Sequence, residues 1–122
     1  MHLVAGRRVG DAIACAVSGT QILLPFPVHY RPRVADGEPV TIGLRPEHLR
    51  LTSAGEAPGL QCTVEMVEMS VSDAAHILHL RHNDHSFCAK VALQQPVRPR
   101  EIVWLHFPPQ HLYYFDRDDK RL

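Results

Sequence analysis

The 122-residue sequence has no long apolar run and no excess of charge of either sign. Its longest nearly apolar run, Ile22 to Val28, is interrupted by two prolines, whereas a bilayer-spanning helix needs about 20 apolar residues. We therefore expect no transmembrane segment, and the first residues lack the apolar core of a signal peptide. The 13 Lys and Arg residues balance the 13 Asp and Glu residues, so no bulk field would attract the chain to nucleic acid or anionic lipid.

The sequence is also poor in groups that form disulfides, zinc knuckles or catalytic centres. Cys15, Cys62 and Cys88 are odd in number and widely spaced, which argues against a disulfide framework and a structural zinc site. Reduced and buried thiols in a cytoplasmic protein are the simplest interpretation. No G-x-x-x-x-G-K-[ST] phosphate loop occurs, and Gly6 to Gly10 has neither its length nor its lysine. We expect no catalytic residue, no cofactor and no ATP hydrolysis by this chain.

What the sequence does contain is turn residues at short intervals. Ten prolines and seven glycines divide the chain into short segments, which is typical of an all-β domain. Strands are expected at Asp11–Val17, Gln21–Leu24, Val40–Leu44, Leu49–Leu51, Leu60–Met69, Ala74–His82, Phe87–Leu93, Glu101–Phe107 and His111–Asp116. We predict an all-β fold of about eight to ten short strands in one or more OB-type barrels, although the periodicity alone also allows a sandwich.

Three further features concern the connections between these strands. Residues 53–59 hold two glycines, one proline and no large apolar side chain, so we predict a linker between a β module at 1–52 and a second at 60–122. Residues 30–39 are polar and contain two prolines, which predicts a loop. After Met66 the apolar phase shifts to Val67 and Met69, which predicts a β-bulge.

The segment from Val40 to Leu49, V-T-I-G-L-R-P-E-H-L, predicts a charged corner. An alternating, half-buried strand presents Arg45 at its end, and Pro46 fixes its own φ angle and holds Arg45 extended. The proline and the following Glu47 favour one helical or 3-10 turn, with the carboxylate near its positive end. Arg45 and Glu47 would bind a small anion or a partner, or would pair with each other within the domain.

This corner resembles the G-[ILV]-R-P-E-H element of the transport-associated OB (TOBE) domain. That domain is the C-terminal regulatory part of ATP-binding subunits in ABC importers of the maltose and glycerol-phosphate type. Cys62 to Met69, with Glu68, is similar to the family's V-x-x-V-E strand. Val103 to Leu122, with His111, Phe115-Asp116 and Arg121-Leu122, is similar to its V-x-L-x-F-x-P-x-x-x-H-x-F-D-x-x-T-G-x-R-L ending. Met1 to Val4 is similar to the family's first residues. The resemblance therefore extends over nearly the whole chain.

The sequence departs from the family pattern at two turns. Met69-Ser70 stands where the family usually has L-G, and Asp118-Asp119-Lys120 stands where it has T-G. Both departures change local turn geometry rather than the fold. They indicate a divergent member.

The resemblance implies a regulatory and dimerisation domain of an importer for sugars or sugar-phosphate-like solutes, without its ATPase domain. Its implied partners are a second copy in a homodimer, the attached ATPase domain, membrane permease subunits and a regulatory protein, but no nucleic acid. The implied location is cytoplasmic, peripheral to the inner membrane, and ATP and Mg²⁺ would belong to the full-length subunit. The expected contact residues are Arg45, Pro46, Glu47, His48, Glu68, Tyr113, Tyr114, Phe115 and Asp116. The alternatives are an OB module that senses a sugar or an oxyanion and, less favoured, a single-stranded nucleic-acid-binding OB protein.

Histidines recur at every third position in His76, His79, His82 and His85. In strands this spacing places neighbours on opposite faces, so only His82 and His85 come close, on either side of the Asn83-Asp84 turn. Exposed imidazoles are the favoured interpretation, and a metal site at this pair is the less favoured one.

Aromatic residues gather near the end of the chain, with five of the eight between Trp104 and Phe115. OB barrels can stack bases or sugars on such rings, but the zero net charge weighs against nucleic acid. Core and dimer contacts are therefore preferred. Glu65 and Glu68 fall on opposite faces of a regular strand unless a bulge intervenes, so a solvated or interface role is preferred to acid–base chemistry.

Overall fold

The computed structural model describes residues 1–52, 55–92 and 97–122, which form ten strands and three short 3-10 helices. The strands are β1 (His2–Val9), β2 (Ala12–Val17), β3 (Thr20–Pro25), β4 (Pro39–Leu44), β5 (Arg50–Thr52), β6 (Gly59–Ser70), β7 (Ala75–His82), β8 (His85–Ala92), β9 (Ile102–His106) and β10 (Tyr113–Phe115). The 3-10 helices are η1 (Val28–Arg33), η2 (Pro46–His48) and η3 (Pro109–His111). The predicted all-β fold is confirmed. Among the described residues no helix is long and apolar enough to cross a membrane.

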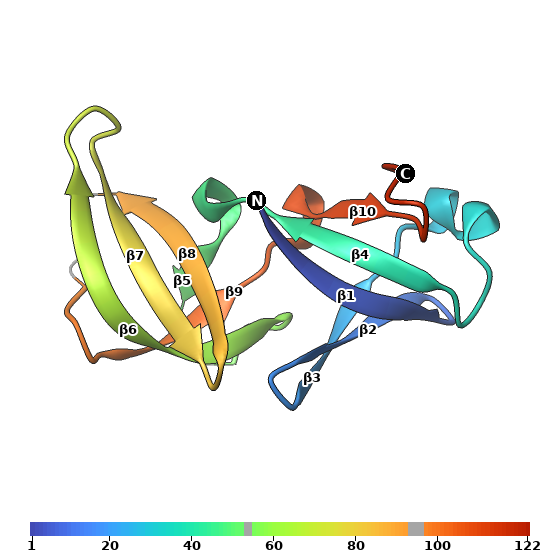
Figure 1. Cartoon of the computed structure of the whole chain (residues 1–122), viewed down its shortest axis with the longest axis horizontal. Coiled ribbons are helices and arrows are strands. Elements are labelled where there is room, and N and C mark those ends of the chain that lie inside the picture. Colours follow the sequence, from blue (N-terminus) through green and yellow to red (C-terminus); the bar gives the residue numbers. More distant parts are fainter. Residues whose placement is uncertain (53–54, 93–96) are drawn as a thin grey trace.

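Two five-stranded antiparallel sheets lie side by side (Figure 1). Sheet 1 has the strand order β10-β4-β1-β2-β3, and sheet 2 has the order β5-β9-β6-β7-β8. Advancing every strand number by five, cyclically, converts one order into the other. The two halves of the chain therefore repeat one arrangement, except that each half gives its last strand to the other sheet. Thus β5 pairs with β9, and β10 pairs with β4.

Because of this exchange, sheet 1 combines β1 to β4 with the last strand of the chain, β10, whereas sheet 2 is built from the consecutive strands β5 to β9. Part of the predicted linker, residues 53–54, lies outside the described residues, and Gly59 already belongs to β6. The remaining part is anchored to β9, since Trp104 Nε1 donates to the Glu56 carbonyl at 2.6 Å and His106 Nδ1 lies 3.0 Å from the Pro58 carbonyl. The division into modules at 1–52 and 60–122 stays a prediction about domain organisation.

Two elements differ from the prediction. β1 was not expected, because its sequence does not alternate and places Arg7 beside Arg8. Arg8 turns inward, and its guanidinium donates to the carbonyls of Arg31 and Val34 at 2.8 and 2.6 Å. These carbonyls lie at the end of η1, the 3-10 helix that replaces the first part of the expected loop.

The predicted bulge in β6 is confirmed by a register shift against β7 between Val64 and Met66. The extra residue is Glu65, whose carboxylate lies 3.0 Å from Arg81 Nε. Beyond the bulge, β6 and β7 continue as a long hairpin that extends past β5 and β9, and β8 pairs with β7 along its whole length (Figure 1).

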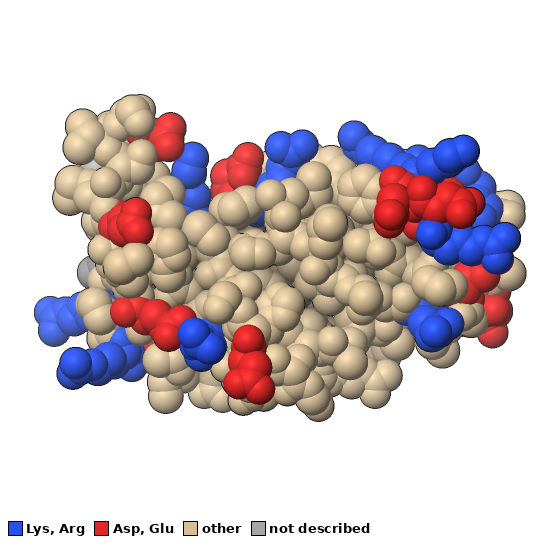
Figure 2. Space-filling model, viewed as in Figure 1, with Lys and Arg blue, Asp and Glu red and all other residues tan. Residues whose placement is uncertain are grey.

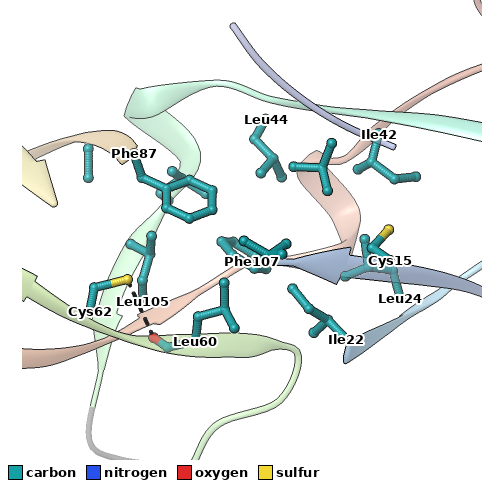
Figure 3. Packing of buried hydrophobic residues seen from close by; sticks show 14 of the residues in the cluster. Cys15, Ile22, Leu24, Ile42, Leu44, Leu60, Cys62, Phe87, Leu105 and Phe107 are labelled. Carbon is teal, nitrogen blue, oxygen red and sulfur yellow. Dashed lines mark hydrogen bonds between the residues drawn. The ribbon is translucent and has the colours of Figure 1, made fainter. Parts of the chain in front are cut away.

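Both sheets contribute to a single hydrophobic core among the described residues. Figure 3 shows side chains of sheet 2, such as Phe87 and Leu105, on one side and side chains of sheet 1, such as Ile42 and Leu24, on the other, with Phe107 between them. The ring of Phe107 is 1% exposed and lies 5.8 Å from the ring of Phe87, centroid to centroid. The two sheets are therefore joined through their interior as well as through exchanged strands.

Candidate functional site

The chain passes between the sheets at two places, and the R-P-E-H motif forms the first of them. We call residues 45–49, between β4 and β5, the first crossover. Arg45 is extended, with φ −93° and ψ 134°, as expected for a residue before proline. The His48 N–H donates to the Arg45 carbonyl at 3.0 Å, which closes the turn η2, and Leu49 then enters the core at 3% exposure. The R-P-E-H motif thus forms the turn that leads the chain from β4 in sheet 1 to β5 in sheet 2.

The second crossover, residues 107–112 between β9 and β10, has the same construction. The His111 N–H donates to the Pro108 carbonyl at 3.0 Å, and the Leu112 N–H donates to the Pro109 carbonyl at 3.3 Å. Both crossovers contain the sequence P-x-H-L, at residues 46–49 and 109–112. The repeated P-x-H-L sequence could have predicted that the two crossovers are equivalent. It is missed when each motif is considered separately.

The two crossovers meet through their histidines. The rings of His48 and His111 are stacked, with centroids 4.3 Å apart and planes inclined by 20°. His48 Nδ1 is buried and has no hydrogen-bond partner among the described residues. His48 was expected as a contact residue for a partner, which stays a prediction; in this structure its half-buried ring contacts His111 of the second crossover.

Arg45 lies over an aromatic ring instead of pairing with Glu47. Its guanidinium carbon is 5.1 Å from the centroid of the Tyr113 ring, and that of Arg121 is 4.7 Å from the same centroid. Neither arginine has a carboxylate within ion-pair distance among the described residues. Two exposed positive charges therefore converge on one tyrosine, in a geometry suited to an anion or an acidic partner.

Glu47 is exposed on the other side of the corner. A hydrogen bond with its own backbone N–H, and then the charges of His48, Arg45 and Lys90, hold the pKa of its carboxyl below the usual value. It lines an open hollow of about 250 Å³ whose other lining residues are Leu49, Arg50, Leu51, Lys90 and Val91. An ionised carboxylate beside two cations is suited to a polar contact rather than to proton transfer.

Glu68 belongs to the long hairpin and not to the crossovers. Its Oε1 lies 3.0 Å from His79 Nε2, and the side chains of His79 and Glu68 are 39% and 52% exposed. Its described contacts include no residue of either crossover. The structure therefore does not bring Glu68 together with Arg45 and Glu47.

The expected contact residues from Tyr113 to Asp116 divide between surface and interior. Tyr114 is buried, its hydroxyl donates to the Pro25 carbonyl at 2.7 Å, and burial raises its pKa to about 12. Asp116 Oδ1 accepts hydrogen bonds from the backbone N–H groups of residues 118 and 120, both at 2.9 Å. Tyr113 and Phe115 alternate with Tyr114 and are half-buried, so these two rings are the accessible part of the segment.

The crossovers, β10 and all five strands of sheet 2 fall within the segment that matches a known family. The sequence pattern of the TOBE domain matches residues 42–115, more than half of the chain. The chain belongs to the TOBE domain family. The resemblance seen in the R-P-E-H motif is thereby confirmed.

Curated relatives of this TOBE domain are ATP-binding proteins of importers. The sn-glycerol-3-phosphate import ATP-binding protein UgpC of Escherichia coli O1:K1 is 30% identical over 116 residues, which are 95% of this chain and 31% of that protein. UgpC of Paraburkholderia xenovorans is 31% identical over 118 residues, which are 95% of this chain and 32% of that protein. UgpC of Salmonella typhimurium is 33% identical over 95 residues, which are 78% of this chain and 25% of that protein. The chain spans about a third of the length of these relatives.

The fold of this TOBE domain is also found in a solved structure. The cytoplasmic molybdate-binding protein ModG, crystallised with molybdate bound, superposes with a TM-score of 0.70 and covers 93% of this chain and 94% of its own. Sequence identity is 11%, so the likeness concerns the OB-type fold alone.

The histidines of the β7–β8 hairpin have structural contacts in this TOBE domain. His82 and His85 face each other across the turn as predicted. However, His82 Nε2 lies 2.7 Å from the Thr20 hydroxyl and its Nδ1 lies 2.7 Å from the Gln61 carbonyl. A metal ion at His82 would have to displace one of these contacts. In the described part of the chain, no group of three or more His, Cys, Asp or Glu side chains has a metal-binding arrangement.

Proposed function

We propose that this TOBE domain is the regulatory and dimerisation domain of the ATP-binding subunit of an ABC importer for a sugar or a sugar phosphate. The observation that carries the proposal is the 30% identity over 95% of the chain with a glycerol-3-phosphate import ATP-binding protein. The matched part is 31% of that protein, so an ATP-hydrolysing domain would lie outside it. ATP and Mg²⁺ would be cofactors of that domain, and the TOBE domain itself performs no catalysis.

The mechanism we propose is mechanical. Two copies of the domain stay paired and hold their attached ATPase domains together while those open and close. A regulatory protein or the solute shifts the resting state by binding one arrangement better than the other. The shared core of the two sheets supports this role, because a domain with one interior moves as one body.

The implied partners are a second copy, the ATPase domain and the permease subunits, and the implied place is the cytoplasmic side of the inner membrane. Nucleic acid is not among them. On the side shown in Figure 2, acidic and basic side chains lie next to one another and leave a broad central area uncharged. Such a surface lacks the basic stripe that nucleic-acid binding requires.

A chimera tests the proposal. The segment of the E. coli protein that matches this chain is replaced by residues 1–122, and the chimera is produced with the importer's other subunits in a strain that lacks the native protein. We expect glycerol-3-phosphate uptake, and a nucleotide-free dimer by light scattering, both well above those of the subunit truncated before this segment. If the chimera matches the truncated subunit in both measurements, the proposed function is wrong.

A second function, the binding of a small oxyanion, is supported by Arg45 and Arg121, which converge on Tyr113 without a carboxylate partner among the described residues. The structural neighbour is by its title a molybdate-binding protein. Titration calorimetry with molybdate, sulfate, phosphate and glycerol 3-phosphate tests this function. We expect a dissociation constant below about 1 mM for one of these anions and a loss of binding in Arg45→Gln, with Arg117→Gln as the control. No binding of any of them by the native domain contradicts it.

A further inference from the structure

The outer face of sheet 1, opposite the core, is largely apolar, although Gln21 and Thr41 also point outward. β2 contains no polar residue, since Ile13, Cys15 and Val17 point into the core and the three alanines between them, at positions 12, 14 and 16, point outward. An antiparallel sheet with one solvated face normally alternates apolar with polar residues. Both faces of this strand therefore have the composition of a buried surface.

The strands on either side of β2 extend this apolar face. Leu3 and Val9 of β1 are 59% and 56% exposed, and Leu23 of β3 is 60% exposed. In the register of the sheet, Ala14 lies between Arg7 and Leu23. Beyond β1, Leu3 lies opposite Gly43, which in turn lies opposite Tyr113. Small residues thus keep the middle of the face flat, and larger apolar ones surround it.

Sheet 2 provides an internal control because it has the same strand order. Its outward-facing residues are polar or charged at most positions, and they include Gln61, Thr63, Glu65, Arg81, Ser86 and Lys90. Glu65 and Arg81 form an ion pair on this face. The OB-type arrangement therefore does not itself require an apolar outer face, and the composition of sheet 1 needs another cause.

We propose that the outer face of sheet 1 packs against the same face of a second copy of this chain. This inference rests on the pairing role proposed above and assigns a surface to it. A twofold contact brings each residue near its own counterpart region, so a charged face would repel itself. On the strands of this face the one charged outward side chain among the described residues is Arg7, and its guanidinium already donates to the Gly37 carbonyl at 3.0 Å. At the β10 edge, the guanidinium groups of Arg45 and Arg121 lie over the Tyr113 ring. The part of the face formed by β2 and β3, which carries no charged outward residue, is thus compatible with a copy of itself.

The size of the face sets the strength of the contact. Five strands about 4.8 Å apart, with outward residues over about 17 Å of strand, give a footprint of about 400 Å² on each copy. The two copies together would bury about 800 Å², which is less than the roughly 1,200–2,000 Å² of surface buried in stable protein–protein interfaces. We therefore expect a weak dimer of the isolated chain, with a dissociation constant of about 10 µM or higher. In a full-length subunit the attached domains would add to this contact.

Sedimentation velocity on the native chain and three variants, from about 10 µM to about 1 mM, tests the inference. Leu23→Glu and Ala16→Glu place a charge on the outer face of sheet 1. Ile102→Glu is the matched control, since Ile102 lies on the outer face of sheet 2 and is 64% exposed against 60% for Leu23. We expect concentration-dependent dimerisation of the native chain and of Ile102→Glu. In the two sheet 1 variants the dissociation constant should rise at least tenfold, with thermal melting confirming that each variant is folded.

Two results overturn the inference, and they differ in what they say about the pairing role. If the native chain dimerises and the sheet 1 variants dimerise equally well, the surface is wrong while the pairing role stands. If the native chain stays monomeric to about 1 mM, this face does not bind a second copy. The pairing role then depends on the chimera, in which the attached ATPase domains are present.

Discussion

Replacing Phe107 by alanine should destabilise both sheets together. Phe107 is 1% exposed, its side chain lies between the two groups of core residues, and it is the first residue of the second crossover (Figure 3). Its removal costs the transfer free energy of a buried aromatic ring plus that of the cavity left behind, about 3–5 kcal/mol in all. A domain of this size has a total stability of about 5–15 kcal/mol. The variant should therefore remain folded but with a much lower urea midpoint.

The assay follows urea unfolding by Trp104 fluorescence and by far-UV circular dichroism. Trp104 lies on β9 and reports on sheet 2, whereas dichroism reports on all ten strands. Because the core is shared, the two curves should coincide in the native protein and in Phe107→Ala. Ile102→Ala, at an exposed position, is the control and should change stability by less than about 0.5 kcal/mol. Separate transitions by the two probes, or a loss below about 1 kcal/mol in Phe107→Ala, would refute the reasoning.

Three further predictions concern single contacts. Burial, the N-terminal charge and His85 hold the pKa of His2 below 6.5, and its Nε2 accepts the Cys88 N–H at 2.7 Å. The unfolded chain therefore binds the proton more readily, and stability should fall as the pH decreases below about 6.5, less so in His2→Gln, as urea midpoints at two pH values will show. Tyr114→Phe should lose about 1 kcal/mol at neutral pH, because the hydroxyl bonded to Pro25 is removed. Since the pKa of Tyr114 is raised to about 12, the native chain should also lose stability as the pH rises from about 10 to 12, and the variant should lose less, as alkaline melts will show. Gly59→Ala would place a Cβ 2.5 Å from Trp104 Nε1 and should cost about 2–3 kcal/mol with altered Trp104 fluorescence. Gly37→Ala, at φ +84° in open space, should cost only about 1 kcal/mol.

The sequence predicts most individual strands because each one carries its own pattern. Alternation and turn residues located nine of the ten described strands, and the phase shift after Met66 located the bulge. β1 lacks this alternation, because two of its residues reverse the usual rule that apolar side chains point inward and charged ones outward. Leu3 points away from the core, and Arg8 points inward, where carbonyl groups about 25 residues away accept its hydrogen bonds.

Strand partners could not be predicted in the same way. β5 and β10 read as short strands whichever sheet they join, because local pattern does not encode the neighbour. The exchange follows from the crossovers, whose P-x-H-L turns redirect the chain. For the same reason the sequence predicted Arg45 and Glu47 at a rigid corner, but not that Arg45 would share the ring of Tyr113 with Arg121.

The repeated topology separates what the fold needs from what one half alone uses. Residues common to both crossovers serve the turn that both must make, and these are the proline, histidine and leucine of P-x-H-L. Residues that differ between the two crossovers are not required for the turn. Arg45 and Glu47 of the first crossover correspond to Pro108 and Gln110 of the second, so the turn itself requires neither charge. The R-P-E-H motif thus contains a structural part and a part free to contact a partner.

This separation makes opposite predictions for two neighbouring residues. His48→Ala removes the stacked ring from His111 and should cost about 1–2 kcal/mol of stability. Arg45→Gln removes an exposed contact with Tyr113 and should cost less than about 1 kcal/mol. In the chimeric importer, however, Arg45→Gln should change uptake or its regulation at unchanged protein level, whereas His48→Ala should act only through the amount of folded subunit. Normal uptake and regulation in Arg45→Gln would contradict this prediction, because the charge of Arg45 would then serve neither transport nor its regulation.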